Sequence, residues 1–363
     1  METQTEQMVE EKSEQFAERM VDSLNRASII LMVSIGHRTG LFDTMAEMKP
    51  STSHEIAAAA GLNERYVREW LGAMCTGGVI HFEPETRTFS LPSEHAAFLT
   101  RKASPNNIAA FAQWIPVLAR VEDHIAEAFK HGRGVPYEAY HRFHDVMEED
   151  SGQTVVAALE EYILPLVPGL VERLKVGIEV LDIGCGSGKA VNLMARLFPN
   201  SRFTGYDFLE EGIIRARMEA DDSDLTNVRF EVLDAARLDE QQKYDLITAF
   251  DAIHDQPQPK VVLRNLHNAL KPDGIFLMQD IAASSHLHNN LDHPVGPFLY
   301  TVSTMHCMSV SLAGGGPGLG ALWGKEMALE MLSEAGFVQP RVEQLSHDFQ
   351  NYFYISTRNH TGN

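Results

Sequence analysis

The stretch Val180-Leu181-Asp182-Ile183-Gly184-Cys185-Gly186-Ser187-Gly188 decides the fold of this chain of 363 residues. An apolar strand leads there into a loop with glycine at every second position. The acid Asp207 closes the next predicted strand, about twenty residues later. Glycine lets the backbone approach a ligand where any Cβ would block it, and a carboxylate at the second strand end can hold ribose hydroxyls. The combination predicts a nucleotide-cofactor site.

The spacing of the glycines distinguishes between cofactors. Dinucleotide folds usually carry Gly-x-Gly-x-x-Gly, with the pyrophosphate on a helix N-terminus. Here Gly184, Gly186 and Gly188 follow Gly-x-Gly-x-Gly, with Asp182 before them. Glycines also serve ordinary turns, but the strand before the loop and the acid after it favour a binding loop. The segment resembles motif I of the class I S-adenosylmethionine-dependent methyltransferases.

Composition limits the classes of partner. The formal charge of −20 disfavours phosphate-rich nucleic acids and anionic membrane surfaces. Three cysteines (Cys75, Cys185, Cys307) are too few for a disulfide framework and lack metal-ligand spacing, which favours reduced thiols. The polar N-terminus lacks the apolar run of a signal peptide, and residues 27–35 are too short to span a bilayer. We expect a cytoplasmic protein that binds no nucleic acid and no membrane.

The first 103 residues read as an N-terminal helix followed by a winged helix. Residues 1–14 are expected to be frayed. A long amphipathic helix follows, and then two short helices separated by Gly61-Leu62, with Asn63 capping the second. Strands are predicted at 79–82 and 86–91. The apolar stripe of the long helix contains Phe16, Met20, Leu24, Ala27 and Leu31.

The charges of this domain favour dimerisation over DNA binding. On the second short helix, two glutamates and two arginines at positions 64–69 cancel. The wing tip Glu83-Pro84-Glu85 is acidic, where a DNA-binding wing would be basic. We therefore predict a homodimer built on residues 1–103.

Residues 104–168 are predicted to form a helical connector with helices at 108–129, 137–147 and 154–166. Its aromatic residues read either as core or as the roof of a substrate pocket; they are Trp114, Tyr137, Tyr140, His141 and His144. From 169 to 358, strands alternate with helices, which predicts an α/β, Rossmann-like domain. Its strands are expected at 179–183, 202–206, 228–232, 244–250 and 274–279, then at 338–345 and 352–356 after a helix at 325–335.

An insertion at 282–323 interrupts the last part of this domain. It contains three consecutive glycines, Gly314 to Gly316, followed by Pro317 and Gly318. Such a segment suits a mobile lid. His286, His288 and His293 lack acidic or cysteine partners at ligand spacing, so we expect a solvated loop and no metal.

The chain as a whole resembles the winged-helix class I methyltransferases, a bacterial-type group that includes uncharacterised mycobacterial members. The matching stretches are residues 64–71, the glycine loop, 252–255, 270–274 and 335–337. The architecture is also similar to that of caffeic-acid-type and acetylserotonin-type O-methyltransferases, which dimerise through an N-terminal winged helix.

This resemblance implies S-adenosyl-L-methionine as the cofactor and a role for each matching residue. The three glycines would face the methionine portion and the sugar, and Asp182 would anchor the methionine end. Asp207 would hold both ribose hydroxyls. The adenine would lie beside Phe208, with Asp234 accepting from its amino group and the amide of Ala235 reaching a ring nitrogen. Phe250 completes the expected cofactor site. An acid at a strand end is otherwise often a helix cap, a reading that applies above all to Asp234.

His254 is the candidate general base. Methyl transfer to a hydroxyl requires a proton acceptor, and a histidine with a pKa near 6.5 suits that role. His254-Asp255 resembles the His-Asp pair of the O-methyltransferases, although Gln256 stands where they have tryptophan. Many methyltransferases carry a histidine at this point without using it as a base, so a role in pocket shape alone stays open.

The sequence thus predicts a methyltransferase for a small, aromatic or apolar acceptor, with oxygen as the favoured site and His254 as the base. Methylation at nitrogen, sulfur or carbon without a base is the alternative among enzymes. A winged-helix regulator that senses S-adenosylmethionine is the alternative from another class.

Overall fold

The structure is a computed structural model that describes residues 2–358, with side-chain burial from residue 9 on. It contains two compact units, which divide between Pro116 and Val117. The predicted connector, 104–168, is therefore shared between the two units. Over the described residues, no single helix is long and apolar enough to cross a membrane, although the bent pair Phe143–Leu166 and Leu170–Val176 passes by length and composition.

The first unit is a winged helix on a long helix. Helix α1 spans Glu2–Arg38, so the expected fraying of residues 1–14 is wrong from Glu2 onward. It is followed by α2 (Leu41–Ala46), α3 (Ser53–Ala60), α4 (Glu64–Thr76), β1 (His81–Glu83), β2 (Thr88–Ser90), α5 (Ser93–Leu99) and the start of the connector. Strands β1 and β2 pair antiparallel to form the wing.

The wing strands are shorter than predicted. The predicted strand at 79–82 begins only at His81, because the amides of Val79 and Ile80 both donate to the carbonyl of Met74 and so close the end of α4. The helix starts agree with the sequence. Thr52 forms a capping box with Glu55, and Asn63 Oδ1 accepts from the amide of Arg65 at 3.0 Å.

Helix α1 packs its C-terminal end onto this unit. Trp70 Nε1 donates to the carbonyl of Met32 at 2.9 Å. A Cβ on Gly36 would come within 2.5 Å of the Trp70 ring, so only glycine allows this approach. The predicted apolar stripe farther up the helix is exposed: Phe16 is 56% and Leu24 68% accessible.

The second unit contains a seven-stranded sheet in the order β5-β4-β3-β6-β7-β9-β8. All neighbours are parallel except at β9, which pairs antiparallel with β7 and β8. The strands are β3 (Glu179–Ile183), β4 (Arg202–Asp207), β5 (Val228–Val232), β6 (Tyr244–Phe250), β7 (Leu270–Ile281), β8 (Val338–Glu343) and β9 (Asn351–Thr357). Strand order reverses beside β3, and open α/β sheets bind ligands at the carboxyl ends of the strands at such a point.

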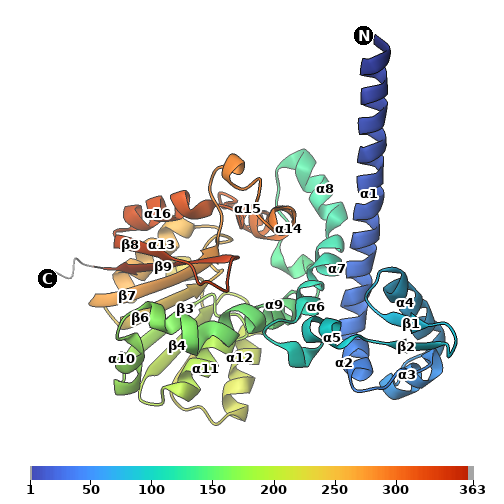
Figure 1. The fold of residues 1–363 in the computed structure, drawn as a ribbon. Helices are drawn as coiled ribbons and strands as arrows, with labels where there is room; N and C mark the ends of the chain where they lie inside the picture. The colour runs from blue at the N-terminus through green and yellow to red at the C-terminus, as the bar shows by residue number, and fades with distance from the viewer. Residues whose placement is uncertain (1, 359–363) are drawn as a thin grey trace. The chain divides into compact units, whose positions relative to one another are not determined.

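Helices cover both faces of this sheet (Figure 1). One face carries α10 (Leu170–Val176), α11 (Lys189–Leu197) and α12 (Glu210–Asp222). The other carries α13 (Pro259–Ala269) and α16 (Gly324–Ala335). The predicted α/β, Rossmann-like architecture is confirmed.

The connector helices are more broken than the periodicity predicts. The predicted helix at 108–129 is divided into α6 (Ile108–Phe111), α7 (Trp114–Ala119) and α8 (Glu122–His131). Arg142, at φ 65°, interrupts the predicted 137–147 helix, so that α9 spans only Phe143–Ser151. Residues 152–166 continue as π and 3₁₀ turns.

The insertion is helical, with α14 (Gly296–Val302), a π turn at Ser303–Cys307 and α15 (Met308–Ala313). Its glycine segment packs on the loop after β6: a Cβ on Gly316 would lie 2.6 Å from the Cα of Pro257. Ser311 Oγ donates to the carbonyl of Gln256 at 3.0 Å. The insertion therefore adjoins the edge of the sheet where the site lies. Its predicted movement as a lid stays a prediction.

Candidate active site

The glycine loop needs glycine for two separate reasons. Gly184, Gly186 and Gly188 all have positive φ, between 52° and 72°, which disfavours other residues. A Cβ on Gly184 would also lie 2.4 Å from the Cβ of Ala252, and one on Gly188 would lie 2.6 Å from that of Ala216. The amides of the three glycines donate within the protein, to the carbonyl of Tyr206, the carboxylate of Asp207 and the carbonyl of Cys185, so the conformation of the loop is fixed.

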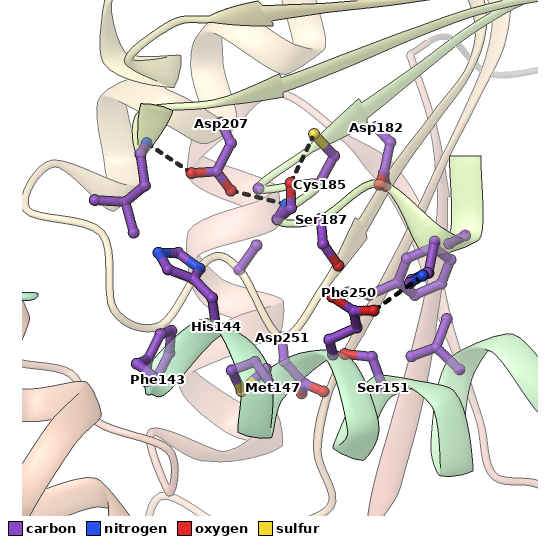
Figure 2. Close-up of a pocket in the computed structure, with 18 of the residues that line it drawn as sticks. Phe143, His144, Met147, Ser151, Asp182, Cys185, Ser187, Asp207, Phe250 and Asp251 are labelled. Atoms are coloured by element: carbon purple, nitrogen blue, oxygen red, sulfur yellow. Dashed lines mark hydrogen bonds and ion pairs between the residues drawn. The ribbon is translucent and has the colours of Figure 1, made fainter. Parts of the chain in front are cut away.

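Asp207 is held by backbone amides at the end of β4. Its carboxylate accepts from the amide of Gly186 at 2.9 Å and from that of Leu209 at 2.8 Å (Figure 2). Burial raises the pKa of Asp207, and these two amides oppose the rise. The side chain is therefore fixed before any ligand arrives, with further acceptor capacity for hydroxyl groups.

Asp182 is a second buried carboxylate, in β3. Thr248 Oγ1 donates to its Oδ1 at 2.6 Å, from the neighbouring strand β6. Burial raises the pKa of Asp182 to about 7, with the Thr248 hydroxyl acting in the opposite direction. A bound cation would favour the ionised form of this carboxyl.

The pocket at this edge of the sheet is acidic. Among its lining residues are the carboxylates of Glu148, Asp182, Asp207, Asp251 and Asp255. The lysine in the lining, Lys189, forms ion pairs with Glu148 and Glu219 at 2.9 and 2.8 Å. S-adenosylmethionine has a sulfonium and an ammonium group, so this surplus of carboxylates suits it by charge.

Six of the predicted cofactor residues line this pocket: Asp182, Gly184, Gly186, Asp207, Phe208 and Phe250. The other three lie outside the lining. Gly188 begins α11 and packs against Ala216. Asp234 caps the short turn Ala235–Arg237 by accepting from the amide of Ala236 at 2.9 Å, and Ala235 is buried. The adenine contacts of Asp234 and Ala235 stay predictions.

Helix α9 supplies pocket residues that the sequence did not single out. Phe143, Met147 and Ser151 line the cavity from this helix (Figure 2). Two of the aromatic candidates, Tyr137 and His144, also belong to the lining, with His144 placed to act electrostatically on Asp207. Tyr140 and His141 line an adjoining hollow, and Trp114 is buried in the first unit.

His254 pairs with an acid that the sequence analysis missed. Its Nδ1 lies 2.8 Å from Oδ1 of Asp280, near the carboxyl end of β7, and both side chains are buried. Burial alone would lower the pKa of His254, but the attraction of Asp280 outweighs it and raises that pKa well above 6.5. Asp280 lies near the end of β7, the strand beside β6. An acid at that position was the feature of the sequence that could have identified it.

His254 is buried near a cluster of aromatic rings at the cavity. His254 does not belong to the pocket lining, whereas its neighbour Asp255 does. The thiol of Cys307 lies close enough to the His254 ring to affect the pKa of His254, and the Tyr137 hydroxyl donates to Asp255. The cluster consists of Tyr137, Phe143 and His306, whose rings contact one another at centroid distances of 4.3–5.4 Å.

Comparison with protein families identifies two domains. Residues 27–101 match the Rv2258c-like winged HTH domain, and residues 174–336 match a methyltransferase domain. The malonyl-[acyl-carrier protein] O-methyltransferase of Bacillus cereus is 35% identical over 100 residues, which is 28% of this chain and 36% of that protein. The ubiquinone biosynthesis O-methyltransferase of Neisseria meningitidis serogroup C is 30% identical over 117 residues, 31% and 48% of the two chains. This chain thus matches less than half the length of these curated relatives.

Solved structures resemble nearly the whole chain. Human N-acetylserotonin methyltransferase, solved in complex with SAM, has a TM-score of 0.70 at 16% identity, over 94% of this chain and 97% of that one. The mitomycin 7-O-methyltransferase MmcR has a TM-score of 0.69 at 17% identity, over 95% and 99%. These likenesses confirm the predicted fold, and the bound SAM agrees with the predicted cofactor. The chain thus carries an Rv2258c-like winged helix-turn-helix domain followed by a methyltransferase domain.

Proposed function

We propose that this enzyme transfers the methyl group of S-adenosylmethionine to a hydroxyl of a small, aromatic or apolar acceptor, with His254 as the general base. The observation that carries this proposal is the buried pair of His254 and Asp280, 2.8 Å apart, next to an acidic pocket. The names of the relatives as O-methyltransferases support oxygen as the methylated atom.

The pair gives His254 a defined orientation. With Nδ1–H donated to Asp280, the other ring nitrogen is the one that can accept a proton from the acceptor hydroxyl. The cofactor supplies the electrophilic methyl, while the protein aligns the acceptor with it and excludes water. Only the neutral imidazole can act as a base. Because the pKa of His254 is raised above that of an ordinary histidine, the base form should predominate only at a higher pH than for an ordinary histidine.

The burial of His254 favours a second candidate. Because His254 is buried and lies outside the pocket lining, an acceptor reaches its other ring nitrogen only if the side chains between them move aside. An amine, thiolate or carbanion acceptor needs no such contact. Methylation at nitrogen, sulfur or carbon, with His254 shaping the pocket, is therefore the alternative.

A screen with labelled cofactor tests the proposal. The protein is incubated with methyl-labelled S-adenosylmethionine and a small-molecule extract, and labelled products are identified by mass spectrometry. A methyl ether or ester as the product supports oxygen. A methylated amine, thiol or carbon supports the alternative, and absence of labelled product at saturating cofactor contradicts both.

We also propose that two copies associate through the first unit. The exposed side chains Phe16, Met20, Leu24 and Leu31 give α1 an apolar stripe, and a second copy would bury it. Light scattering at micromolar concentration should give twice the monomer mass of 40.5 kDa. Leu24→Glu should shift the population toward monomer. Glu18→Gln, a polar substitution at another exposed position of α1, should not. Monomer mass for the unmodified chain contradicts the proposal.

DNA binding is not expected of this winged helix. On α4, Arg65 pairs with Glu69 and Arg68 with Glu64, so the arginines are already neutralised locally. Salt-dependent retention of duplex DNA at low ionic strength would instead support the regulator. A cytoplasmic location stays part of this proposal.

A further inference from the structure

Three ligand-type side chains meet behind the acceptor end of the pocket. We call Asp251, His254 and Asp280 the acidic cluster; one donor atom from each lies within 4.8 Å of the other two. They come from the loop after β6 and from near the end of β7, which are adjacent strands. A set of two carboxylates and one imidazole matches the ligands of divalent transition metals.

Two oxygens of this cluster are buried without a partner. Oδ1 of Asp251 and Oδ2 of Asp280 have no hydrogen bond among the described residues, and the side chain of Asp280 is fully buried. The remaining oxygens are engaged: Asp251 Oδ2 accepts from Gln279 Nε2 at 2.9 Å, and Asp280 Oδ1 accepts from the amide of Ile281 at 2.8 Å. Unpaired buried carboxylate oxygens are costly, so each calls for a ligand.

The backbone around Asp251 is held in an unfavourable conformation. Its φ of 51° lies in the left-handed region, which is unfavourable for a residue other than glycine. The hydrogen bond from Gln279, which is itself buried, fixes the carboxylate in this conformation and leaves Oδ1 turned to other partners. Strain of this kind concentrates at binding and catalytic sites.

The positions of Asp251 and Asp280 relative to the pocket limit the size of a ligand that could bind both. Asp251 belongs to the pocket lining, so the ammonium of the cofactor or of an acceptor could reach it. Asp280 does not belong to the lining, and its free oxygen is closed to a group carried on a larger molecule. A single small cation can reach both carboxylates, because one oxygen of each lies within 4.8 Å of the other, and it would neutralise two carboxylates beside one imidazole.

We propose that the acidic cluster is a divalent-cation site, with one oxygen each from Asp251 and Asp280 and one nitrogen of His254 as ligands. In the metal-bound form His254 is a ligand and not the base, because a coordinated nitrogen neither carries a proton nor accepts one. The mixed oxygen and nitrogen donors favour a transition metal such as Mn²⁺ over Ca²⁺. This inference rests on the proposed function only in placing the cluster at the acceptor end, because cation binding is measured without acceptor or turnover.

The test is titration of the full-length, EDTA-treated protein with MnCl₂, followed by calorimetry and by the loss of the free Mn²⁺ signal in electron paramagnetic resonance. We expect one Mn²⁺ per chain. Asp251→Asn and Asp280→Asn keep the side-chain size and should each weaken binding by about tenfold or more. Asp273→Asn removes the same charge from an exposed position in β7 and should bind as the unmodified protein does.

Circular dichroism of each variant establishes that it is folded. No saturable binding below about 1 mM, or equal binding by all three variants, overturns the metal site. In that case the two oxygens are satisfied by protons or water.

Discussion

The two ends of the pocket differ in how their carboxylates are satisfied. At the glycine-loop end, both oxygens of Asp207 accept from backbone amides, and Asp182 accepts from Thr248. In the acidic cluster beside the proposed acceptor end, Asp251 and Asp280 each keep one buried oxygen without a partner among the described residues. The first end is thus complete before the cofactor arrives, whereas the second is arranged for a ligand that is still to come.

The two ends also differ in which segments of the chain form them. The glycine-loop end is built from two neighbouring strands and the loop between them. The acceptor end is assembled from the loop after β6, the end of β7, the residue Tyr137 and the π turn that carries His306 and Cys307. If the acceptor binds where we propose, its recognition depends on segments that are distant in the sequence.

The largest effect is expected at the acceptor end, from His254→Ala. If the imidazole takes the proton of a hydroxyl acceptor, its removal should lower turnover by about 10²–10⁴-fold, with the affinity for S-adenosylmethionine nearly unchanged. The measurement is turnover at saturating acceptor, compared with His286→Ala, which removes an exposed histidine from the insertion.

The pH profile sharpens the same prediction. Because the Asp280 carboxylate raises the pKa of His254, turnover should rise with pH through a value above 6.5. Asp280→Asn removes the charge and should move this acid limb to lower pH. Turnover of His254→Ala equal to that of the unmodified enzyme would leave His254 with a role in pocket shape only.

A smaller loss is expected at the glycine-loop end, from Asp207→Ala. Removing a charged acceptor of two ribose hydroxyls should weaken cofactor binding by about 1.5–3 kcal/mol, measured by isothermal titration. The variant also loses the bonds to the amides of Gly186 and Leu209, which hold the loop. The cofactor affinity of Asp207→Asn, which keeps one acceptor oxygen, should lie between that of Asp207→Ala and that of the unmodified protein. Unchanged affinity in Asp207→Ala would contradict the ribose assignment.

These two sites show what the sequence could predict. The strands at 179–183, 228–232 and 244–250 are confirmed to the residue. The first and third are mainly apolar and buried, whereas the second alternates apolar with charged residues, and both patterns predict strands. The glycine loop and Asp207 lie in one short segment, so their spacing already contains the geometry. His254 is found next to its strand, but nothing in its own segment reveals Asp280, 26 residues later.

The acceptor end could not be predicted for the same physical reason. The bond from Tyr137 to Asp255 joins residues 118 positions apart, and only the folded sheet and connector bring them together. The prediction of no metal considered ligand spacing along the chain around His286. The acidic cluster has no such spacing, since adjacent parallel strand ends supply its members. Helix breaks such as Arg142 were missed because apolar periodicity continues across them.

Cofactor affinity should also depend on pH, by about tenfold. The pKa of Asp182 is raised to about 7, so the carboxyl is mostly protonated at pH 6 and mostly ionised at pH 8. If the ionised form anchors the methionine ammonium, affinity should increase about tenfold over this range. Isothermal titration at several pH values measures it, and Asp182→Asn should bind weakly and without this dependence. A flat profile in the unmodified protein would contradict the anchoring role.

The smallest effect is expected from the ion pairs that tie α9 to the glycine-loop end. Lys189 joins Glu148 on α9 to Glu219 on α12, so it holds together elements that border the cofactor pocket. These side chains are about a third exposed, and such pairs contribute at most about 1 kcal/mol. Lys189→Met keeps the aliphatic stem and should speed cofactor release only about twofold to fivefold.

Stopped-flow dissociation measures this rate, and added salt should speed release from the unmodified protein but not from the variant. Lys175→Met is the matched control, because Lys175 pairs with Glu172 within α10 alone. Equal release from all three proteins would show that α9 is held over the cofactor by its apolar contacts, and that the pairs contribute nothing to closure.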